Sequence, residues 1–346
     1  MSTKLLVIGD VHVKLDNLLE IQTLLEKIKE TVSTHEPDII VLLGDILHTH
    51  ERVHTNCLNM AMDLFRLCSQ LKPTYVLVGN HDFISNSQFL TTHHWMNSFK
   101  KWDNLTIVDT IHTLIHHNNR FMFAPYVPDG RLVEALEKAE EFRFTDAHMI
   151  FVHQTLDGVK MGMNIANGVE EWKPDYPFCC SGHIHDKQRV QPNLYYNGTP
   201  MPHAFGERND KTVSLFTVEN GTIVTHQELR LDVCSKRIEY VTVQEAYDWN
   251  IEPKPHQLVR LTIKGTPEEI RAFKRSDAYK KLYQQQIKMV FDEVTGQETK
   301  TFSNRLSFEE TLYEAIKEDP HLSHWFRTYI GNTSQDPELV FIDIES

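Results

Sequence analysis

The chain has few cysteines, and they lack the spacing that structural zinc sites and redox pairs use. Five cysteines occur among 346 residues, an odd number, and no two of them form a CxxC pair. A disulfide framework or a zinc ribbon is therefore not expected, and we expect buried thiols instead. The cysteines are Cys57, Cys68, Cys179, Cys180 and Cys234.

Long apolar runs are also missing. No stretch approaches the roughly 18 consecutive apolar residues of a transmembrane helix, and the N-terminus enters a strand-like pattern by Lys4 without the apolar region of a signal peptide. We therefore expect a cytoplasmic protein without a membrane partner. With 40% hydrophobic residues, the chain can bury a full core, and its length fits one large domain with smaller additions.

The sequence has no excess of positive charge and no P-loop of the kind that binds ATP. A formal net charge of -13 and a pI near 5.8 argue against a protein that binds polyanions through its overall charge. A nucleic-acid substrate would need a local source of positive charge, which bound divalent cations can supply. Any dependence on ATP would have to come from a partner.

Residues 4–152 alternate strand-like runs with helix-like stretches, a pattern typical of an α/β layered domain. Apolar residues recur at helical spacing over 18–32, with Asp16 as the expected N-cap, and again over 58–71. Residues 213–226 predict a hairpin closed by an Asn-Gly turn. We expect this hairpin to belong to a second, more antiparallel sheet, which makes a sandwich with helices outside.

The pattern changes beyond about residue 235. Segments 258–263, 267–283 and 287–291 predict a small β-α-β unit, and 306–316 and 322–330 predict two short helices with apolar faces. The predicted division is therefore a domain over 1–235, a second over 236–300 and a helical segment over 301–346.

Polar side chains follow five buried strand-like runs, at the point where each run ends. They are Asp10 and His12, then Asp45, then Asn80, His81 and Asp82, then His153, and finally His183 and His185. Because the carboxyl ends of parallel strands meet at one sheet edge, we expect these side chains to converge. Carboxylates, an amide and imidazoles suit two divalent cations, which promote phosphodiester hydrolysis. Asp45, alone at its strand end, suits a carboxylate that bridges both ions.

Each motif alone has an ordinary structural explanation, since Gly-Asn-His-Asp is often a turn and a histidine at a strand end often faces solvent. Five such strand ends in one chain favour a shared site. The remaining paired or isolated histidines fall outside these motifs, and we expect them on solvated helix faces or loops. They are His50, His54, His93, His94, His116 and His117.

The order of these motifs resembles the calcineurin-like metallophosphoesterase superfamily over about residues 4–230. The segment 44–48, Gly-Asp-Ile-Leu-His, is similar to the SbcD-type nuclease subunit of DNA double-strand-break repair, as are 197–200 and 205–207. The Asp-Arg-Gly motif of protein Ser/Thr phosphatases is absent. The resemblance implies a four-layer α-β-β-α sandwich with a small α+β capping domain and C-terminal helices.

The resemblance also implies roles for individual residues. One ion would be held by Asp10, His12, Asp45 and His185, and the other by Asp45, Asn80, His153 and His183. His81 would contact the scissile phosphate and assist the leaving oxygen, Asp82 would orient the ring of His81, and His48 would lie near the phosphate. Manganese is the expected ion, with magnesium or iron as alternatives.

The remaining implications concern partners. The capping domain would help to select DNA geometry, with basic residues that either contact DNA or form an ordinary solvated helix face: Arg271, Lys274, Arg275, Lys280 and Lys281. The C-terminal helices would dock onto the coiled coil of an SbcC-like ABC-type ATPase, in a heterotetramer containing a homodimer of this subunit, or would pack against the chain's own core.

The leading functional prediction is a metal-dependent hydrolase of DNA. It would act as a 3'-5' exonuclease and single-strand endonuclease in DNA recombination and double-strand-break processing, together with the ATPase. Two alternatives stay open: a phosphodiesterase for small nucleotides on the same core, and a scaffold subunit whose catalysis is secondary.

Overall fold

The computed structural model describes residues 1–50, 52–162, 164–250, 253–294 and 322. The chain divides into two compact units, Met1–Glu293 and Val294–Ser346. The helices predicted over 306–316 and 322–330 lie outside the described residues, apart from residue 322. The predicted division at residues 235 and 300 stays a prediction.

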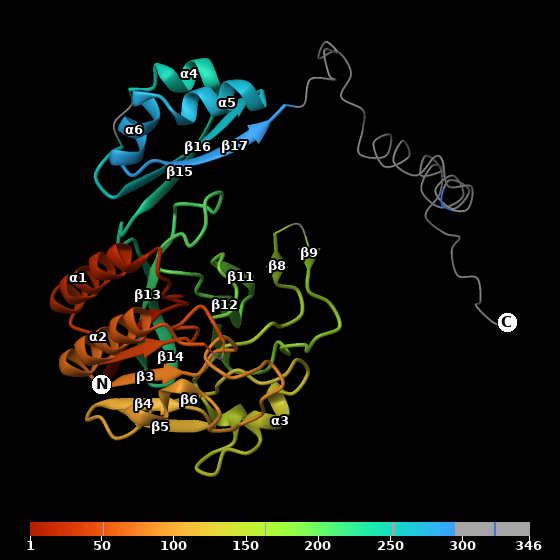
Figure 1. The fold of residues 1–346 in the computed structure, drawn as a ribbon. Helices are drawn as coiled ribbons and strands as arrows, with labels where there is room; N and C mark the ends of the chain where they lie inside the picture. The colour runs from red at the N-terminus through yellow and green to blue at the C-terminus, as the bar shows by residue number, and fades with distance from the viewer. Residues whose placement is uncertain (51, 163, 251–252, 295–321, 323–346) are drawn as a thin grey trace. The chain divides into compact units, whose positions relative to one another are not determined.

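The first sheet has six strands in the order β14-β13-β1-β2-β3-β4 (Figure 1). They are β1 (Ser2–Ile8), β2 (Ile39–Leu42), β3 (Thr74–Leu77), β4 (Leu105–Val108), β13 (Val213–Glu219) and β14 (Thr222–Leu229). β1 to β4 are parallel, so their carboxyl ends share one edge. The predicted hairpin is present as β13 and β14, but it pairs with β1.

The second sheet also has six strands, in the order β11-β12-β10-β7-β6-β5. They are β5 (His112–His116), β6 (Asn119–Phe123), β7 (Met149–Val152), β10 (Phe178–Ser181), β11 (Gln188–Gln191) and β12 (Leu194–Tyr196). The four central strands are parallel, and only β5 and β11 at the edges are antiparallel. The expectation that the 213–226 hairpin belongs to a second, more antiparallel sheet is therefore wrong, because the hairpin extends the free edge of β1. A separate ribbon is formed by β8 (Lys160–Met161) and β9 (Asn164–Ile165).

The two large sheets pack face to face around a shared apolar layer. In β1, Leu5 and Val7 point into this central layer, while Leu6 and Ile8 point outward to a second cluster under the helices. Side chains alternate between the faces of a strand, so a strand with both faces buried must be apolar throughout. This is why the runs at the strand positions are continuous rather than alternating.

Helices cover the outer face of the first sheet. They are α1 (Leu18–His35) and α2 (Thr55–Leu71), and both contribute to the outer cluster. The N-cap of α1 is Asn17 rather than the predicted Asp16. The carboxamide of Asn17 accepts a hydrogen bond from the backbone N–H of Lys14 and donates one to the carbonyl of His12. It therefore shapes the loop after β1 instead of capping helical N–H groups.

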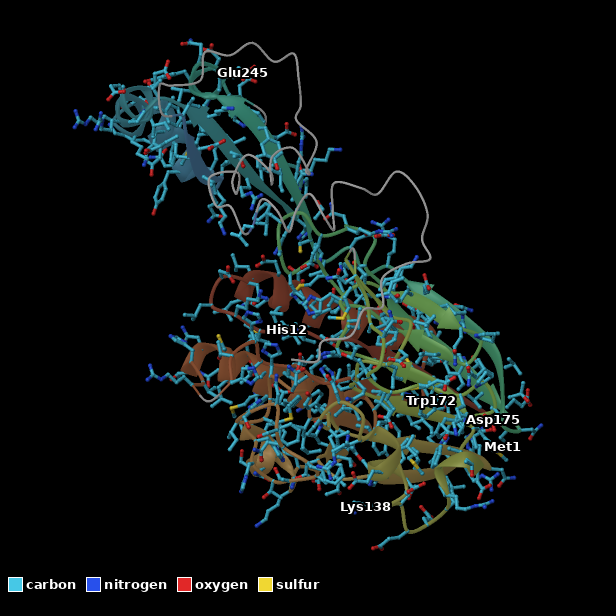
Figure 2. The ribbon with its side chains drawn as sticks, turned by 90° about the vertical axis from the view of Figure 1, so that its right-hand side faces the viewer. Met1, His12, Lys138, Trp172, Asp175 and Glu245 are labelled. Atoms are coloured by element: carbon cyan, nitrogen blue, oxygen red, sulfur yellow. The ribbon has the colours of Figure 1, made fainter. Side chains whose placement is uncertain are left out.

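The outer face of the second sheet carries a thinner layer. It contains α3 (Leu132–Leu136) and the short 3-10 helix η2 (Phe144–Asp146), which share one apolar cluster. A second 3-10 helix, η1 (Trp95–Phe99), packs in the outer cluster of the first sheet instead. Trp172, labelled in Figure 2, is 2% exposed and belongs to the apolar cluster on this face. The predicted α-β-β-α sandwich is confirmed, with loops completing the fourth layer.

Residues 235–293 form a separate three-stranded parallel sheet of β15 (Ser235–Thr242), β16 (Gln257–Gly265) and β17 (Lys288–Glu293). Three helices lie on one of its faces (Figure 1) and share an apolar cluster with it: α4 (Val243–Tyr247), α5 (Pro267–Lys274) and α6 (Asp277–Gln284). The predicted β-α-β unit is present, and its charged stretch is broken into α5 and α6. Both α4 and α5 begin with a capping box, which Thr242 and Glu245 form in α4.

The cysteines have the expected character. Four of the five are buried and Cys234 is half-buried, and all are free thiols. Burial raises the pKa of Cys68 to about 12 and that of Cys234 to about 11, so neither is a nucleophile at neutral pH. None of the described helices combines the length and the apolar character needed to cross a membrane.

Candidate metal centre

The five strand ends converge, but not at one sheet edge as the sequence predicts, because β1, β2 and β3 belong to the first sheet and β7 and β10 to the second. Polar side chains that follow β1, β2, β3, β7 and β10 meet at one end of the sandwich, and their potential ligand atoms form three groups, each within 4.8 Å. The groups are Asp10, His12 and His185; Asp45, His153 and His183; and His12, His48 and His81. Residues up to 175 positions apart in the chain are therefore neighbours.

The first group lies around the end of β1. The Nε2 atoms of His12 and His185 are 3.1 Å apart, and Asp45 Oδ2 is 3.5 Å from His12 Nε2. Asp10 is fully buried, and its Oδ2 atom has no hydrogen-bond partner among the described residues. A buried carboxylate oxygen without a partner is costly unless a ligand satisfies it.

The second group lies beside the first. Its Asp45 also approaches the first group, through the contact with His12. Asn80 Oδ1 is 3.0 Å from His153 Nε2 and 2.9 Å from His183 Nδ1, and Asp45 Oδ1 is 3.3 Å from His153 Nε2. The Nδ1 atom of His153 lies 2.7 Å from the carbonyl oxygen of Leu43, so this nitrogen carries the proton. Nε2 therefore faces the group, and it offers a lone pair there once a bound cation displaces its proton.

The backbone around these groups adopts conformations that most side chains avoid. His12, Asp45 and His183 have φ of 46°, 47° and 74°, in the left-handed region. A Cβ added to Gly79 would lie 2.2 Å from Asp45 Oδ1, and one added to Gly44, at φ 104°, would lie 2.8 Å from His153 Nδ1. Strain and close approach of this kind concentrate at functional sites.

The electrostatics separate the two buried carboxylates. Burial acts to raise the pKa of Asp45, but the charge of His153 and hydrogen bonding to it outweigh this and lower the pKa below its usual range. Burial raises the pKa of Asp10 to about 7. Burial opposes the charged form of His153, but Asp45 and Asp10 raise its pKa to about 9. The pocket thus has a strong preference for a positive charge close to Asp45.

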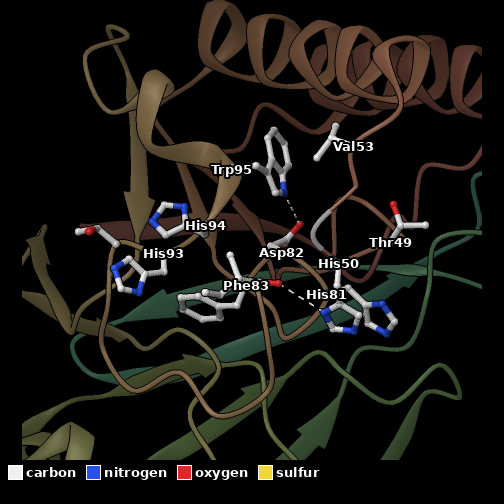
Figure 3. A pocket seen from close by; sticks show the side chains of 11 residues that line it. Thr49, His50, Val53, His81, Asp82, Phe83, His93, His94 and Trp95 are labelled. Atoms are coloured by element: carbon white, nitrogen blue, oxygen red, sulfur yellow. Dashed lines mark hydrogen bonds between the residues drawn. The ribbon is translucent and has the colours of Figure 1, made fainter.

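His81 and His48 lie at the open side of the cluster. His81 Nδ1 is 2.7 Å from the carbonyl oxygen of His48 and donates to it, while His81 Nε2 is 3.9 Å from Asp45 Oδ2. The rings of His48 and His81 are stacked at 5.5 Å, and His50 stacks on the other side of His81 at 4.7 Å. A cavity of about 420 Å³ adjoins His81 and His50, as Figure 3 shows.

Asp82 does not have the contact that the sequence predicts. Its carboxylate accepts hydrogen bonds from the backbone N–H groups of Ile46, Leu47 and Gly79 and from the indole of Trp95 (Figure 3). The expectation that Asp82 orients the ring of His81 is therefore wrong, because that ring is held by the carbonyl of His48. Asp82 instead ties the loop after β2 to the loop after β3, and it positions both.

One histidine beside the ligand groups, His203, is missing from the sequence-based set. The ring of His203 lies 5.1 Å from that of His12 and 5.4 Å from that of His185, and its Nε2 donates to the carbonyl of Asp10 at 2.9 Å. It is 8% exposed. Its only signal in the sequence is its place between the Asn-Gly-Thr-Pro and Phe-Gly-Glu segments, which is too weak to distinguish it from the other histidines.

The histidines outside the motifs have mixed environments. His94 is buried, and its Nε2 is 3.0 Å from Asp109 Oδ2, so the expectation of a solvated position is wrong for it. His54 caps α2 through its ring nitrogen, and His116 contacts the hydroxyl of Thr3 at 3.0 Å. Tertiary contacts decide the environments of His94 and His116, whereas the contact of His54 is local, with the backbone N–H of Asn56.

The five basic side chains predicted to bind DNA lie on α5 and α6 or between them. Arg271 is paired with Glu268 at 2.5 Å and Lys280 with Asp277 at 2.9 Å, so carboxylates one helical turn away offset two of the five charges. Contact between this set and DNA stays a prediction.

The donor set fits divalent cations. It offers an Asp10 oxygen without a hydrogen-bond partner among the described residues, a His153 ring whose Nε2 faces the ligand group, and an Asp45 carboxylate that reaches both groups. Mixed carboxylate, amide and imidazole ligands are typical of manganese, iron and related ions rather than of a thiolate-bound zinc. The assignment of each residue to one ion stays a prediction.

Comparisons with known proteins agree with this chemistry. "Putative phosphoesterase 078R" of Invertebrate iridescent virus 3 is 37% identical over 293 residues, which cover 84% of this chain and 84% of that protein. "Putative phosphoesterase 244L" of Invertebrate iridescent virus 6 is 37% identical over 278 residues, which cover 80% of this chain and 98% of that protein.

Solved structures are more distant. Yfce, a phosphoesterase from E. coli, is 12% identical with a TM-score of 0.30 and covers 66% of this chain and 100% of its own. The family model described as calcineurin-like phosphoesterase matches residues 3–187, more than half of the sequence. The chain therefore belongs to the calcineurin-like phosphoesterase family.

Proposed function

We propose that this metallophosphoesterase is a DNA nuclease, acting as a 3'-5' exonuclease and single-strand endonuclease. The observation that carries the proposal is the position of His48, three residues after Asp45. His48 joins His12 and His81 in one of the three ligand groups, and its carbonyl holds the ring of His81. This histidine belongs to the segment that resembles SbcD-type nucleases, and its place beside the cluster supports that resemblance.

The proposed ligands follow from the two groups. Asp10, His12, Asp45 and His185 would hold one cation, and Asp45, Asn80, His153 and His183 would hold the other. We propose manganese, with magnesium or iron as alternatives. When bound, two such cations would supply a water-derived nucleophile at neutral pH and counter-charge for the phosphate.

The side chains around the cluster would direct the substrate. His81 donates through Nδ1 to the carbonyl of His48, so its Nε2, on the side of Asp45, is the nitrogen that can carry a proton to the leaving oxygen when the ring is cationic. Asp45 Oδ2 lies 3.9 Å from that nitrogen. His48, stacked beside His81, would contact a neighbouring phosphate oxygen.

An SbcC-like ATPase partner remains part of the proposal. The chain has no P-loop, so ATP-dependent control of duplex ends would need a second protein. The segment expected to dock onto its coiled coil, 301–346, lies outside the described residues except for residue 322. Identification of the proteins that purify with the native chain tests this point.

The test of the nuclease uses three substrates with Mn²⁺: a labelled single-stranded oligonucleotide, bis-p-nitrophenyl phosphate and a cyclic nucleotide. We expect cleavage of the oligonucleotide by the wild type and loss of at least 100-fold in His81→Asn. His117→Asn is the matched control, because His117 is an exposed histidine outside the ligand groups whose Nδ1 contacts the carbonyl of Ser2. Hydrolysis of the cyclic nucleotide without DNA cleavage would support the small-nucleotide enzyme, and no hydrolysis at all would support the scaffold.

A further inference from the structure

A second polar cavity adjoins the candidate metal centre. It has a volume of about 420 Å³ and lies where the start of the 235–293 sheet faces the loops after β1 and β12. The residues used below are Lys14, Asp16, Glu20, Phe205, Lys236, Arg260 and Lys288, all of which line it. His203 lines it as well and connects it with the ligand groups, because its ring contacts Asp10 and its carbonyl accepts a hydrogen bond from Lys236 Nζ at 3.0 Å.

Three cations from three adjacent strands or their ends surround one aromatic ring in this cavity. Arg260 Cζ, Lys288 Nζ and Lys236 Nζ lie 5.3, 5.7 and 5.8 Å from the ring centroid of Phe205. The strand register explains the arrangement, since Arg260 pairs with Lys288 across β16 and β17, and Lys236 lies on the same face of β15. The ring attracts each cation and so offsets part of their mutual repulsion.

The positive charge in the cavity is largely uncompensated. Among the described residues, Lys14, Lys236, Arg260 and Lys288 form no ion pair within 4.0 Å, and Arg260 Nε is buried without a hydrogen-bond partner. Two acids, Asp16 and Glu20, also line the cavity, so the four cations exceed them by two. Burial lowers the pKa of Lys14, and Lys236 and Lys288 lower it further, while Asp16 and Glu207 act to raise it.

A polyanion is the ligand that this arrangement fits. A half-buried arginine whose Nε lacks a hydrogen-bond partner among the described residues, with further cations around it, is suited to a phosphate group, which accepts several charge-assisted hydrogen bonds at once. The same open face of the sheet continues to Tyr240, which is 76% exposed and pairs with Thr262 beyond Arg260. Exposed aromatic rings next to cationic grooves are the usual platform for single-stranded nucleic acid.

We infer that this cavity is a phosphate subsite for a backbone phosphate next to the scissile one, formed by Lys14, Lys236, Arg260 and Lys288 around Phe205. The inference rests on the proposed nuclease function and extends it, because it makes an extended strand, rather than an isolated phosphodiester, the preferred substrate. In this inference, the cations that line the cavity, rather than the basic residues of α5 and α6, supply the positive charge beside the ligand groups.

The test compares two charge-neutralising variants on the same strand, Arg260→Gln and Lys264→Gln. Lys264 is exposed on the same sheet face, about 13 Å further along at the usual strand rise. Binding of a fluorescein-labelled single-stranded 12-mer is measured by anisotropy over a range of salt concentrations in EDTA, so that cleavage cannot interfere. The full chain is used throughout.

We expect Arg260→Gln to weaken binding about fivefold and to reduce the slope of log Kd against log salt by about 0.7, the value for one lost single-strand phosphate contact. Lys264→Gln should stay within twofold of the wild type. With Mn²⁺ present, the ratio of kcat/KM for the 12-mer to kcat/KM for bis-p-nitrophenyl phosphate should fall by a similar factor in Arg260→Gln. Lys236→Gln provides a second variant if Arg260→Gln does not fold.

The outcomes separate this inference from the nuclease proposal. Binding of the 12-mer that depends on Arg260, without cleavage, refutes the nuclease but supports the subsite. Cleavage of the 12-mer with equal salt slopes in both variants overturns the subsite and leaves the nuclease intact. Equal losses with the 12-mer and with bis-p-nitrophenyl phosphate also overturn the subsite, because a single phosphodiester does not extend into it.

Discussion

Gly79→Ala tests the position of Asp45 without changing any predicted ligand. An added methyl group would lie 2.2 Å from Asp45 Oδ1 and 2.3 Å from its backbone nitrogen, whereas ordinary contacts begin above about 3 Å. Either the carboxylate or the loop after β3 must therefore move by nearly 1 Å. The backbone of Gly79 does not have a positive φ, so the collision is the main obstacle.

The expected loss follows from that displacement. A misplacement of about 1 Å at a reacting centre costs roughly 100-fold in rate, which corresponds to about 2.7 kcal/mol at 1.36 kcal/mol for each factor of ten. Because Asp45 reaches both ligand groups, we expect the affinity for Mn²⁺ and kcat/KM for bis-p-nitrophenyl phosphate to fall together. Calorimetric titration with Mn²⁺ measures the first, and the colorimetric assay measures the second.

Gly168→Ala is the control for this experiment. A Cβ at Gly168 meets nothing within 4 Å, although its φ of 73° makes any side chain unfavourable. It should therefore lower thermal stability by about 1 kcal/mol without changing Mn²⁺ affinity or turnover. If Gly79→Ala keeps both quantities within twofold of the wild type, the close approach between this loop and Asp45 does not define the site, and the reasoning fails.

Three further predictions concern cations, catalysis and pH. Mn²⁺ at 100 times its Kd should stabilise the fold by about 2.7 kcal/mol per ion, which is measured as a rise of several degrees in Tm. Asp10→Asn should reduce this rise. An unchanged Tm on adding Mn²⁺ would contradict a metal centre. His81→Asn should lower kcat about 100-fold or more with little change in that Mn²⁺-dependent Tm, whereas a parallel loss of the Tm rise would make His81 a ligand instead. Burial and the charge of Arg189 lower the pKa of His226 from 6.5 to about 4, so the folded chain keeps this ring neutral where the unfolded chain protonates it. Stability should therefore fall as the pH drops from about 6.5 toward 4, and His226→Gln should make the fall in Tm over that range shallower; identical pH profiles would show that the ring titrates normally.

Much of the candidate site could be predicted because its signal is local. A buried strand needs a continuous apolar run, and the change to polar residues marks where the strand leaves the sheet. Asp10 and Asp45 each follow such a run, so their convergence at one edge follows from parallel pairing. His153 also follows such a run, but its strand lies in the second sheet, and only the packing of the two sheets brings it to Asp45. The orientation of Asp82 could not be predicted in this way. Its partners include the backbone N–H of Leu47, which lies in another loop and 35 residues earlier in the sequence.

The sheet assignment of the 213–226 hairpin shows the same limit. Its alternating pattern and Asn-Gly turn identify two antiparallel strands, but they do not state which edge the strands join. Pairing with β1 is decided by register across more than 200 residues, with Leu6 opposite Leu215. Burial of His94 against Asp109 is likewise a result of packing rather than of local sequence.

The sequence by itself determined the layered α/β core, the order of the strand ends and the residue types that gather there, because burial and strand periodicity are encoded within short segments. Only the tertiary structure decided which residues share a cavity. Lys14, Phe205, Arg260 and Lys288 come from four distant segments, and none belongs to a motif that signals phosphate binding. They meet because strand register and loop packing bring their side chains around one ring, and contacts of that kind arise only when the chain folds.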